Sequence, residues 1–346
     1  MKRIIALTMF LSLLASAALA AALPKLRVGY VPEPAHGLCF LAKEKGYFKE
    51  EGVDVELFQF GSAAEGVAAV KAGKLDVGTF GTTAPLLFIS KGSEFTFIGG
   101  MMVGGQAIIT RPERLAELSG KDLKVYKGKK IGLVKLSTGD VIFRGALKKA
   151  GIDVKKDLTF VEFGTAAAVV EAVKKGAVDA GLVWPPHFSL AEKNHGLKVS
   201  HYIEEFYPDY TCCRIFAHTG KVNADPETYK KFLTALIRAY KFYKTNPDET
   251  VKVYTKALKI DEDIIRNETY VNKVADSNPD PLRKGILDFW QHILAAGYVP
   301  QDYPVDKHIN TVIYKQALDS VIKKNPKDKV YQQMLTFYKK VRHSNQ

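Results

Sequence analysis

Residues 60–78 read FGSAAEGVAAVKAGKLDVG, and residues 163–181 read FGTAAAVVEAVKKGAVDAG. The two stretches align without gaps at an offset of 103 residues, and 11 of their 19 positions are identical. The same offset places Val28 on Ile131, each within an apolar run. Matching segments at one fixed spacing indicate two copies of one supersecondary unit.

Each copy predicts strands that alternate with helices. Residues 26–31 form a continuous apolar run, which is typical of a strand buried in a parallel sheet. Ser62 followed by Glu65 has the spacing of a capping box, so a helix is expected to begin there. The predicted strands are 26–31, 53–60, 76–80, 130–134, 158–163 and 178–183, and the predicted helices are 37–51, 62–73, 139–150 and 165–175. This order indicates an α/β fold with parallel sheets and right-handed crossovers.

Strand-like runs flank the second copy on both sides. We interpret them as two hinge crossings between two lobes, with a ligand cleft between the lobes. From Asp225 onward the apolar residues recur at helical spacing, so a helical C-terminal tail is expected to pack back on the first lobe. The runs are 95–102, 106–110 and 212–218, and the expected division is 1–22 as signal peptide, 23–106 with 216–346 as lobe 1, and 107–215 as lobe 2.

The first 22 residues are predicted to be a secretory signal peptide. Lys2 and Arg3 precede an apolar run at residues 4–14, and residues 18–20 read ALA, which fits a small-residue cleavage site. No cysteine stands at that site, so we expect a periplasmic protein without a lipid anchor. No later stretch reaches about 18 consecutive apolar residues, so no membrane insertion is expected.

Length, charge and cysteine content narrow the class of protein. The chain has 346 residues, enough for two lobes with separate cores. The formal net charge is +13, but the lysines are scattered and match no nucleic-acid motif, so solvated helix faces are expected and no nucleic-acid partner. Three cysteines are too few and too irregular for a disulfide framework.

The candidate ligand site lies in the turns that follow the strands, because ligands of open parallel sheets bind outside the carboxyl ends of the strands. Several of these turns place glycine beside serine or threonine before a helix. Their free N–H groups, hydroxyls and helix dipole suit an anionic or strongly polar ligand. The candidate ligand-binding residues are His36, Ser62, Gly81, Thr82, Thr83, Ser137, Thr138, Thr165, Trp184 and Arg214.

Most of these candidates also have an ordinary structural role. Ser62, Thr83 and Thr165 can cap their helices, with or without a ligand contact. Trp184 can stack on a flat ligand or pack under the Pro-Pro turn that follows it. His36 can donate a hydrogen bond to the ligand, or it can form hydrogen bonds only within its own turn.

The run Cys212-Cys213-Arg214 falls where the chain is expected to return to the first lobe. Arg214 can pair with an anionic ligand as a bidentate donor, or clamp the hinge to an acidic neighbour. The two cysteines can be buried apolar residues, a strained vicinal disulfide or soft metal ligands. Burial is the interpretation we adopt, so no metal and no cofactor are expected.

Sequence motifs of common enzymes are absent. The chain contains no G-x-S-x-G nucleophile elbow, no P-loop and no G-x-G-x-x-G after its first strand. Its histidines never take the HxH or HExxH spacing of a metal site. The sequence therefore favours a binding protein over an enzyme.

Three stretches resemble one known family. LRVGY at 26–30, EKGYFKEEGVDVELF at 44–58 and AAVKAGKLDVGTFG at 68–81 are similar to the nitrate/sulfonate/taurine group of ABC-transporter substrate-binding proteins. The resemblance implies a two-lobed periplasmic-binding-protein fold that closes around its ligand, with an ABC permease and its ATPase as partners. Members take sulfonates, nitrate, bicarbonate, thiamine-pyrimidine precursors or riboflavin-like ligands.

One branch of that family, the pyrimidine-synthase-like proteins, carries a cysteine-rich motif near this hinge. Cys212-Cys213 is similar in position, but Arg214 follows and the further cysteines are missing. We therefore expect a monomeric periplasmic binding protein that delivers a small anionic or polar organic solute to its permease. The alternatives are a binding protein for a heteroaromatic ligand such as a thiamine-pyrimidine precursor, a pyrimidine-synthase-like enzyme, or a sensory binding protein.

Overall fold

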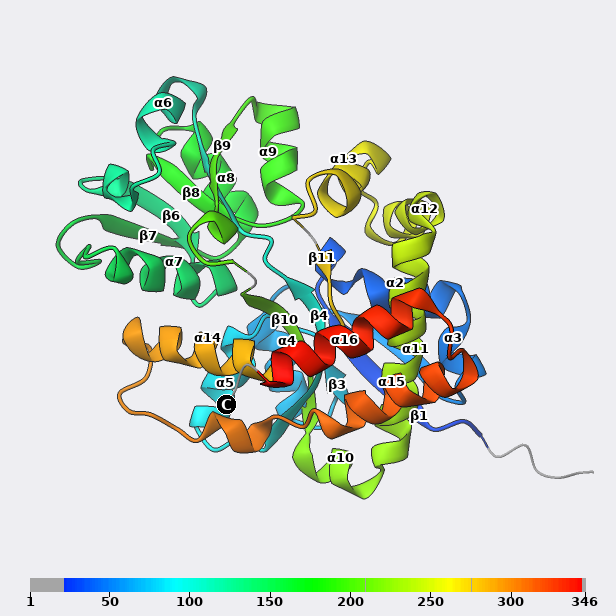
Figure 1. Ribbon diagram of the computed structural model, residues 1–346. Coiled ribbons are helices and arrows are strands. Elements are labelled where there is room, and N and C mark those ends of the chain that lie inside the picture. The colour runs from blue at the N-terminus through cyan, green and yellow to red at the C-terminus, as the bar shows by residue number, and fades with distance from the viewer. Residues whose placement is uncertain (1–21, 209, 275, 344–346) are drawn as a thin grey trace, which may run out of the picture.

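The computed structural model describes residues 22–208, 210–274 and 276–343. The chain forms two lobes, each built around one β-sheet (Figure 1). Sheet A has six strands in the order β11-β4-β10-β3-β1-β2, and sheet B has five in the order β7-β6-β8-β5-β9. The predicted signal peptide lies outside the described residues, apart from Ala22.

The two repeat copies form the parallel parts of the two sheets. Strand β1 pairs in parallel with β2 and β3, and β6 pairs in parallel with β7 and β8. These strands are β1 Lys25–Tyr30, β2 Asp54–Gln59, β3 Val77–Gly78, β6 Lys130–Val134, β7 Thr159–Phe163 and β8 Ala180–Val183. The α/β fold predicted from the repeat is confirmed, although β3 is shorter than the predicted 76–80.

The helices of the repeat cover the sheets as expected, with one difference. The predicted helix 37–51 is broken at Gly46, whose φ of 74° is left-handed and ends the first segment. The helices are α2 Gly37–Glu44, α3 Tyr47–Glu50, α4 Ala63–Lys71, α5 Thr83–Ser90, α7 Thr138–Lys149, α8 Ala166–Lys174 and α9 His187–His195. A short helix, α6 Leu115–Leu118, lies between the copies.

Two crossings join the lobes, as the strand-like runs predicted. In sheet A, β4 Phe95–Val103 pairs antiparallel with β10 Thr211–His218. In sheet B, β5 Ala107–Thr110 pairs antiparallel with β9 Lys198–Tyr202 and with β8. The chain therefore passes from sheet A to sheet B between β4 and β5, and returns between β9 and β10.

The C-terminal tail is helical, as predicted, and packs mainly on the first lobe. Phe232 stacks on Phe48 with ring centroids 5.4 Å apart, which fixes the long helix α11 against α3. The tail comprises α10 Thr219–Ala224, α11 Pro226–Thr245, α12 Pro247–Leu258, α13 Glu262–Arg266, the π-helical turn η5 Asn267–Val271, β11 Asp276–Ser277, α14 Arg283–Ala295, α15 Val312–Lys324 and α16 Lys329–His343.

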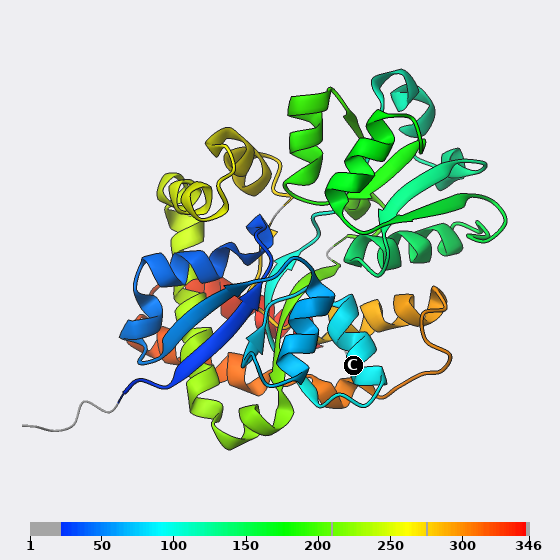
Figure 2. The ribbon, with the colours of Figure 1, turned by 180° about the vertical axis from the view of Figure 1, so that it is seen from behind.

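The tail also contacts the second lobe, which the sequence did not predict. Helix α14 lies along α7 in both views (Figures 1 and 2). A Cβ atom on Gly145 would lie 2.1 Å from Nδ1 of His292, so only glycine permits this close approach. On another side, Lys193 of α9 pairs with Asp263 at 3.1 Å, and Val274 joins the apolar cluster of the second lobe.

Candidate functional site

The two lobes meet at the carboxyl ends of their parallel strands. Trp184 follows β8 in the second lobe, and its indole Nε1 donates a hydrogen bond of 2.7 Å to Oε1 of Glu33, which follows β1 in the first lobe. A Cβ atom on Gly81 would lie 3.2 Å from Oγ1 of Thr138, at the start of α7. Residues from both lobes are therefore in contact where the strand topology places a ligand site.

His36 offers a buried hydrogen-bond acceptor in this region. The hydroxyl of Thr79 donates to the carbonyl oxygen of Gly29 at 2.9 Å, so its oxygen must accept the hydrogen bond of 2.9 Å from Nδ1 of His36. The proton of the neutral ring is then on Nδ1, and Nε2 is an acceptor. This Nε2 is buried and has no hydrogen-bond partner among the described residues. Burial also lowers the pKa of His36 to about 3, so the ring stays neutral.

Glu33 is a second acceptor, and the sequence did not single it out. Burial raises the pKa of its carboxyl to about 7, although the hydrogen bond from Trp184 lowers it. Glu33 lies three residues before His36, within the turn that precedes α2. The sequence Pro-Glu-Pro in this turn could have indicated Glu33, because proline fixes the backbone on both sides of the glutamate.

The hinge strand β10 contacts the first-lobe turn at Gly81 and Thr82. Gly81 forms an isolated antiparallel bridge with Cys213, and the Thr82 hydroxyl donates to the carbonyl oxygen of Cys212 at 2.6 Å. Thr82 is completely buried. From the crossing between the lobes, Nε2 of Gln106 lies 3.9 Å from Sγ of Cys212, which adds another residue that the sequence did not single out.

Arg214 is fully buried, and its terminal nitrogens are used within the first lobe. Nη1 donates to the carbonyl oxygen of Asp280 at 2.7 Å, and Nη2 donates to that of Met102 in β4. Burial lowers the pKa of Arg214 to about 10, so it remains charged at neutral pH. This geometry matches a hinge clamp, with backbone carbonyls in place of the acidic partner that we considered.

Four candidates differ in how their hydroxyls are used. Ser62 and Thr165 cap α4 and α8 as expected, and Ser137 caps α7; each hydroxyl accepts a backbone N–H of its own helix. Thr83 does not cap α5, because Thr82 occupies the position before the helix. The Thr83 hydroxyl is buried and has no hydrogen-bond partner among the described residues.

The second-lobe turn before α7 is held by Asp140, which the sequence reasoning overlooked. Its carboxylate accepts from the backbone N–H of Leu136 at 2.9 Å and pairs with Nε of Arg144 at 2.6 Å. It also accepts from the hydroxyl of Tyr298, which comes from the C-terminal tail. Leu136 has a φ of 61°, which a residue with a side chain rarely adopts. Asp140 therefore fixes the backbone beside Ser137 and Thr138.

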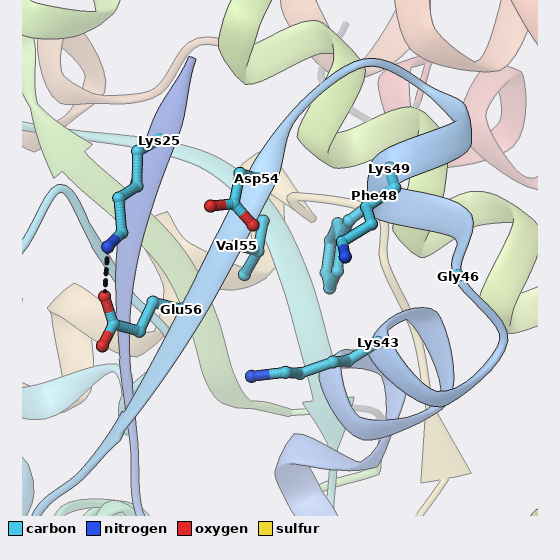
Figure 3. A pocket seen from close by; sticks show the side chains of 8 residues that line it. All are labelled: Lys25, Lys43, Gly46, Phe48, Lys49, Asp54, Val55 and Glu56. Atoms are coloured by element: carbon cyan, nitrogen blue, oxygen red, sulfur yellow. Dashed lines mark ion pairs between the residues drawn. The ribbon is translucent and has the colours of Figure 1, made fainter. Parts of the chain in front are cut away.

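Two surface cavities lie away from this interlobe region. One, of about 400 Å³, opens beside the edge strand β2, where Lys43 and Lys49 lie across the cavity from the ion pair of Lys25 and Glu56 (Figure 3). The other, of about 240 Å³, lies beside α11 in the tail. Neither cavity is lined by a predicted site residue. Among the described residues, no group of three or more histidine, cysteine or acidic side chains could hold a metal ion.

Two lobes that face each other through their strand-helix turns, joined by crossing strands, define a solute-binding protein of the periplasmic-binding-protein fold. The chain belongs to the NMT1/THI5-like family, whose model matches residues 33–250. It is 29% identical over 300 residues to a Brucella abortus protein named as a candidate binding protein, covering 85% of this chain and 91% of that one.

Two solved structures share the fold. The periplasmic nitrate-binding protein NrtA of Synechocystis aligns with a TM-score of 0.75 at 17% identity, over 86% of this chain and 89% of its own. The periplasmic aliphatic sulphonate-binding protein SsuA of Escherichia coli aligns with a TM-score of 0.71 at 16% identity, over 84% and 99%. The family resemblance expected from the sequence is thereby confirmed. In the described part of the chain, no helix has the length and apolar character needed to cross a bilayer.

Proposed function

We propose that this protein is the exported binding component of an ABC importer and that it closes its lobes around a small polar organic solute that donates hydrogen bonds. Family membership and the two-lobed fold support the transport role. A periplasmic location is supported by the N-terminal pattern of Lys2-Arg3 and the apolar run 4–14. The partners would be a permease and its ATPase, and the protein would act as a monomer without catalysis or cofactor.

The observation that carries the ligand chemistry is the pair of acceptors on the turn before α2. Nε2 of His36 is buried and has no donor among the described residues, and the half-buried carboxylate of Glu33, which accepts from Trp184 through Oε1, has a second oxygen that can accept. An oxyanion such as nitrate supplies no donor. A solute with an N–H or O–H group, including an amino-sulfonate, can satisfy them. Backbone N–H groups and hydroxyls at Thr82, Ser137 and Thr138 would hold an anionic end of the same solute.

A heteroaromatic solute is the second candidate, because of Trp184. Its indole ring lies at the contact between the lobes, where it can stack on a flat ligand, and its Nε1 reaches Glu33. A ring that carries an amino group would meet both Trp184 and the acceptors. An enzyme of the pyrimidine-synthase type has less support, since only Cys212 and Cys213 remain of its cysteine-rich motif.

The proposed site is built from both lobes. In the first lobe it uses His36, Gly81, Thr82 and Thr83, and in the second it uses Ser137, Thr138 and Trp184, with Ser62 and Thr165 at its margin. Arg214 would act from beneath as the clamp of the hinge strands. The proposed lobe boundaries are 106/107 and, in place of 215/216, the segment between β9 and β10, because β10 pairs within sheet A.

The test is calorimetric titration of the ligand-free protein with taurine, alkanesulfonates, nitrate and aminopyrimidines. A ligand that donates hydrogen bonds should bind at one per chain, and Trp184→Phe should weaken it about tenfold, or 1.4 kcal/mol, because the contact with Glu33 is lost. Lys43→Gln, at the outer cavity, is the matched control and should leave the affinity unchanged. Tight binding of nitrate together with no binding of any donor-bearing solute would contradict the proposed ligand chemistry.

A further inference from the structure

Cys212 and Cys213 bring their sulfur atoms together on the hinge strand β10. Adjacent side chains of a regular strand point to opposite faces of the sheet. Here the pairing of β10 with β4 shifts register on both sides of Cys213, and Cys212 has no paired residue on β4. Such a bulge re-aims a side chain. As a result the two Sγ atoms lie 3.6 Å apart.

The pair lies beneath the interlobe contact. Cys213 is bridged to Gly81 of the first-lobe turn, and Cys212 Sγ faces the amide of Gln106, in the crossing between the lobes, at 3.9 Å. Both cysteines are buried, with 4% and 5% of their surface exposed. Because Gly81 lies against Thr138 of the second lobe and Gln106 lies in the crossing between the lobes, separation of the lobes would open a path to the sulfur atoms.

The same two residues hold the first-lobe turn of the proposed ligand site. The carbonyl oxygen of Cys212 accepts from both the backbone N–H and the hydroxyl of Thr82, at 2.8 and 2.6 Å. Cys213 is bridged to Gly81. A change in the backbone at this bulge would therefore move Gly81 and Thr82.

We propose that Cys212 and Cys213 are a redox modification site, at which oxidation to a vicinal disulfide distorts the hinge bulge and weakens solute binding. The proposal rests on the proposed export, because disulfides form and persist in oxidising compartments. The oxidant is a disulfide of a small thiol or of a thiol oxidoreductase. One thiolate attacks it and forms a mixed disulfide, and the second thiolate then displaces the oxidant's remaining thiol. The two cysteines lose two electrons and two protons, and the oxidant is reduced to two thiols.

The geometry makes this disulfide reversible. Adjacent Cα atoms are about 3.8 Å apart, whereas ordinary disulfides join Cα atoms at about 4.4–6.8 Å. The sulfur atoms must also approach from 3.6 Å to bonding distance, which the bulge must absorb. A strained disulfide of this kind is more easily reduced than a structural one, which is the property of a regulatory bond.

Closure of the lobes would protect the site. The buried environment and the neighbouring thiol raise the pKa of Cys213 well above its usual range, and a protonated thiol is a poor nucleophile. Separation of the lobes would reduce the burial of Cys213 and leave more of it as thiolate. Ligand-free protein should therefore be oxidised faster than protein saturated with its solute.

The experiment treats ligand-free protein with oxidised glutathione, blocks free thiols with iodoacetamide and digests with trypsin. Cleavage after Lys198 and Arg214 gives one peptide, 199–214, that carries both cysteines, while Cys39 falls in another. We expect this peptide to lose the mass of two hydrogen atoms and to take up no iodoacetamide, and dithiothreitol should reverse both changes. Two alkylated cysteines, or one cysteine holding glutathione, would overturn the proposal.

The effect of oxidation on solute affinity is measured separately, by titration of the oxidised and the reduced protein. The oxidised protein should bind its solute about tenfold more weakly than the reduced protein, within the usual range for coupling between two sites. Cys39→Ser should keep this difference, and Cys213→Ser should abolish it. Equal affinities of oxidised and reduced protein would overturn the coupling. Because the peptide mass needs no ligand, failure of the proposed transport function would not be mistaken for failure of the redox site.

Discussion

Glu268 carries a buried carboxyl whose ionisation should contribute strongly to the pH dependence of stability. It lies in the π-helical turn η5, is completely buried, and neither carboxylate oxygen has a hydrogen-bond partner among the described residues. Burial raises its pKa from 4.5 to about 7. At 1.36 kcal/mol per pH unit, this rise corresponds to about 3 kcal/mol.

The rise in the pKa of Glu268 determines whether the folded state gains or loses stability as the pH rises. Below about pH 4.5 the carboxyl is neutral in the folded and the unfolded chain, so its contribution to stability is fully present. As the pH rises towards 7, the unfolded chain ionises first and the folded state loses that contribution. Glu268→Gln keeps the shape and removes the ionisation, so its advantage over the natural protein should grow by about 2.5 kcal/mol between pH 5 and pH 8.

Urea unfolding of ligand-free protein at four pH values between 5 and 8 measures this difference. The exposed Glu65→Gln is the matched control, and its stability curve should run parallel to that of the natural protein. If the curve of Glu268→Gln also runs parallel to that of the natural protein, the carboxyl does not ionise in a buried site. The proposed environment of Glu268 would then be wrong.

Other substitutions test the contacts around the site. Gly145→Ala should lower the free energy of unfolding in urea by about 1–3 kcal/mol, because the new Cβ would lie 2.1 Å from Nδ1 of His292. Adding His292→Ala should restore most of this stability. If it does not, the contact between the two residues is not the cause. Asp140→Asn should lower the free energy of unfolding by about 3 kcal/mol and weaken solute binding, because it leaves Arg144 without its buried partner. A loss of stability below about 0.5 kcal/mol would contradict that role of Asp140. Thr82→Ala should weaken binding about tenfold by calorimetry while Thr82→Ser retains it, and equal affinities would remove Thr82 from the site.

The repeated phrase predicted the parallel parts of the two sheets because strand burial and helix capping are local in sequence. Ser62 and Thr165 stand at matching positions and cap matching helices. The break at Gly46 was not predicted, because glycine is compatible with both a continuous and an interrupted helix. Hydrophobic periodicity predicts such local preferences, but it does not show which of two local structures the tertiary packing selects.

The site itself was predictable only in part. The topological rule predicted that the turns of Gly81, Thr138 and Trp184 face the opposite lobe, and the structure brings these turns into contact across the lobes. It could not place Glu33 beside Trp184, because the two residues are 151 positions apart and their contact depends on how the lobes close. The sequence could not predict that His36 is an acceptor, since this follows from the hydrogen bonds of Thr79, which no sequence pattern reveals.

The contacts of the C-terminal tail with the second lobe bear on how tightly a solute can bind. Together with the bond between Glu33 and Trp184, they hold the lobes against each other. Apparent affinity equals intrinsic affinity multiplied by the fraction of molecules already competent to bind, so contacts of this kind set the occupancy at low solute concentration. They also set how often an empty, closed molecule would compete with a loaded one for the permease. Loosening Tyr298 from Asp140 would then make transport more selective for loaded molecules, at the expense of uptake from dilute solution.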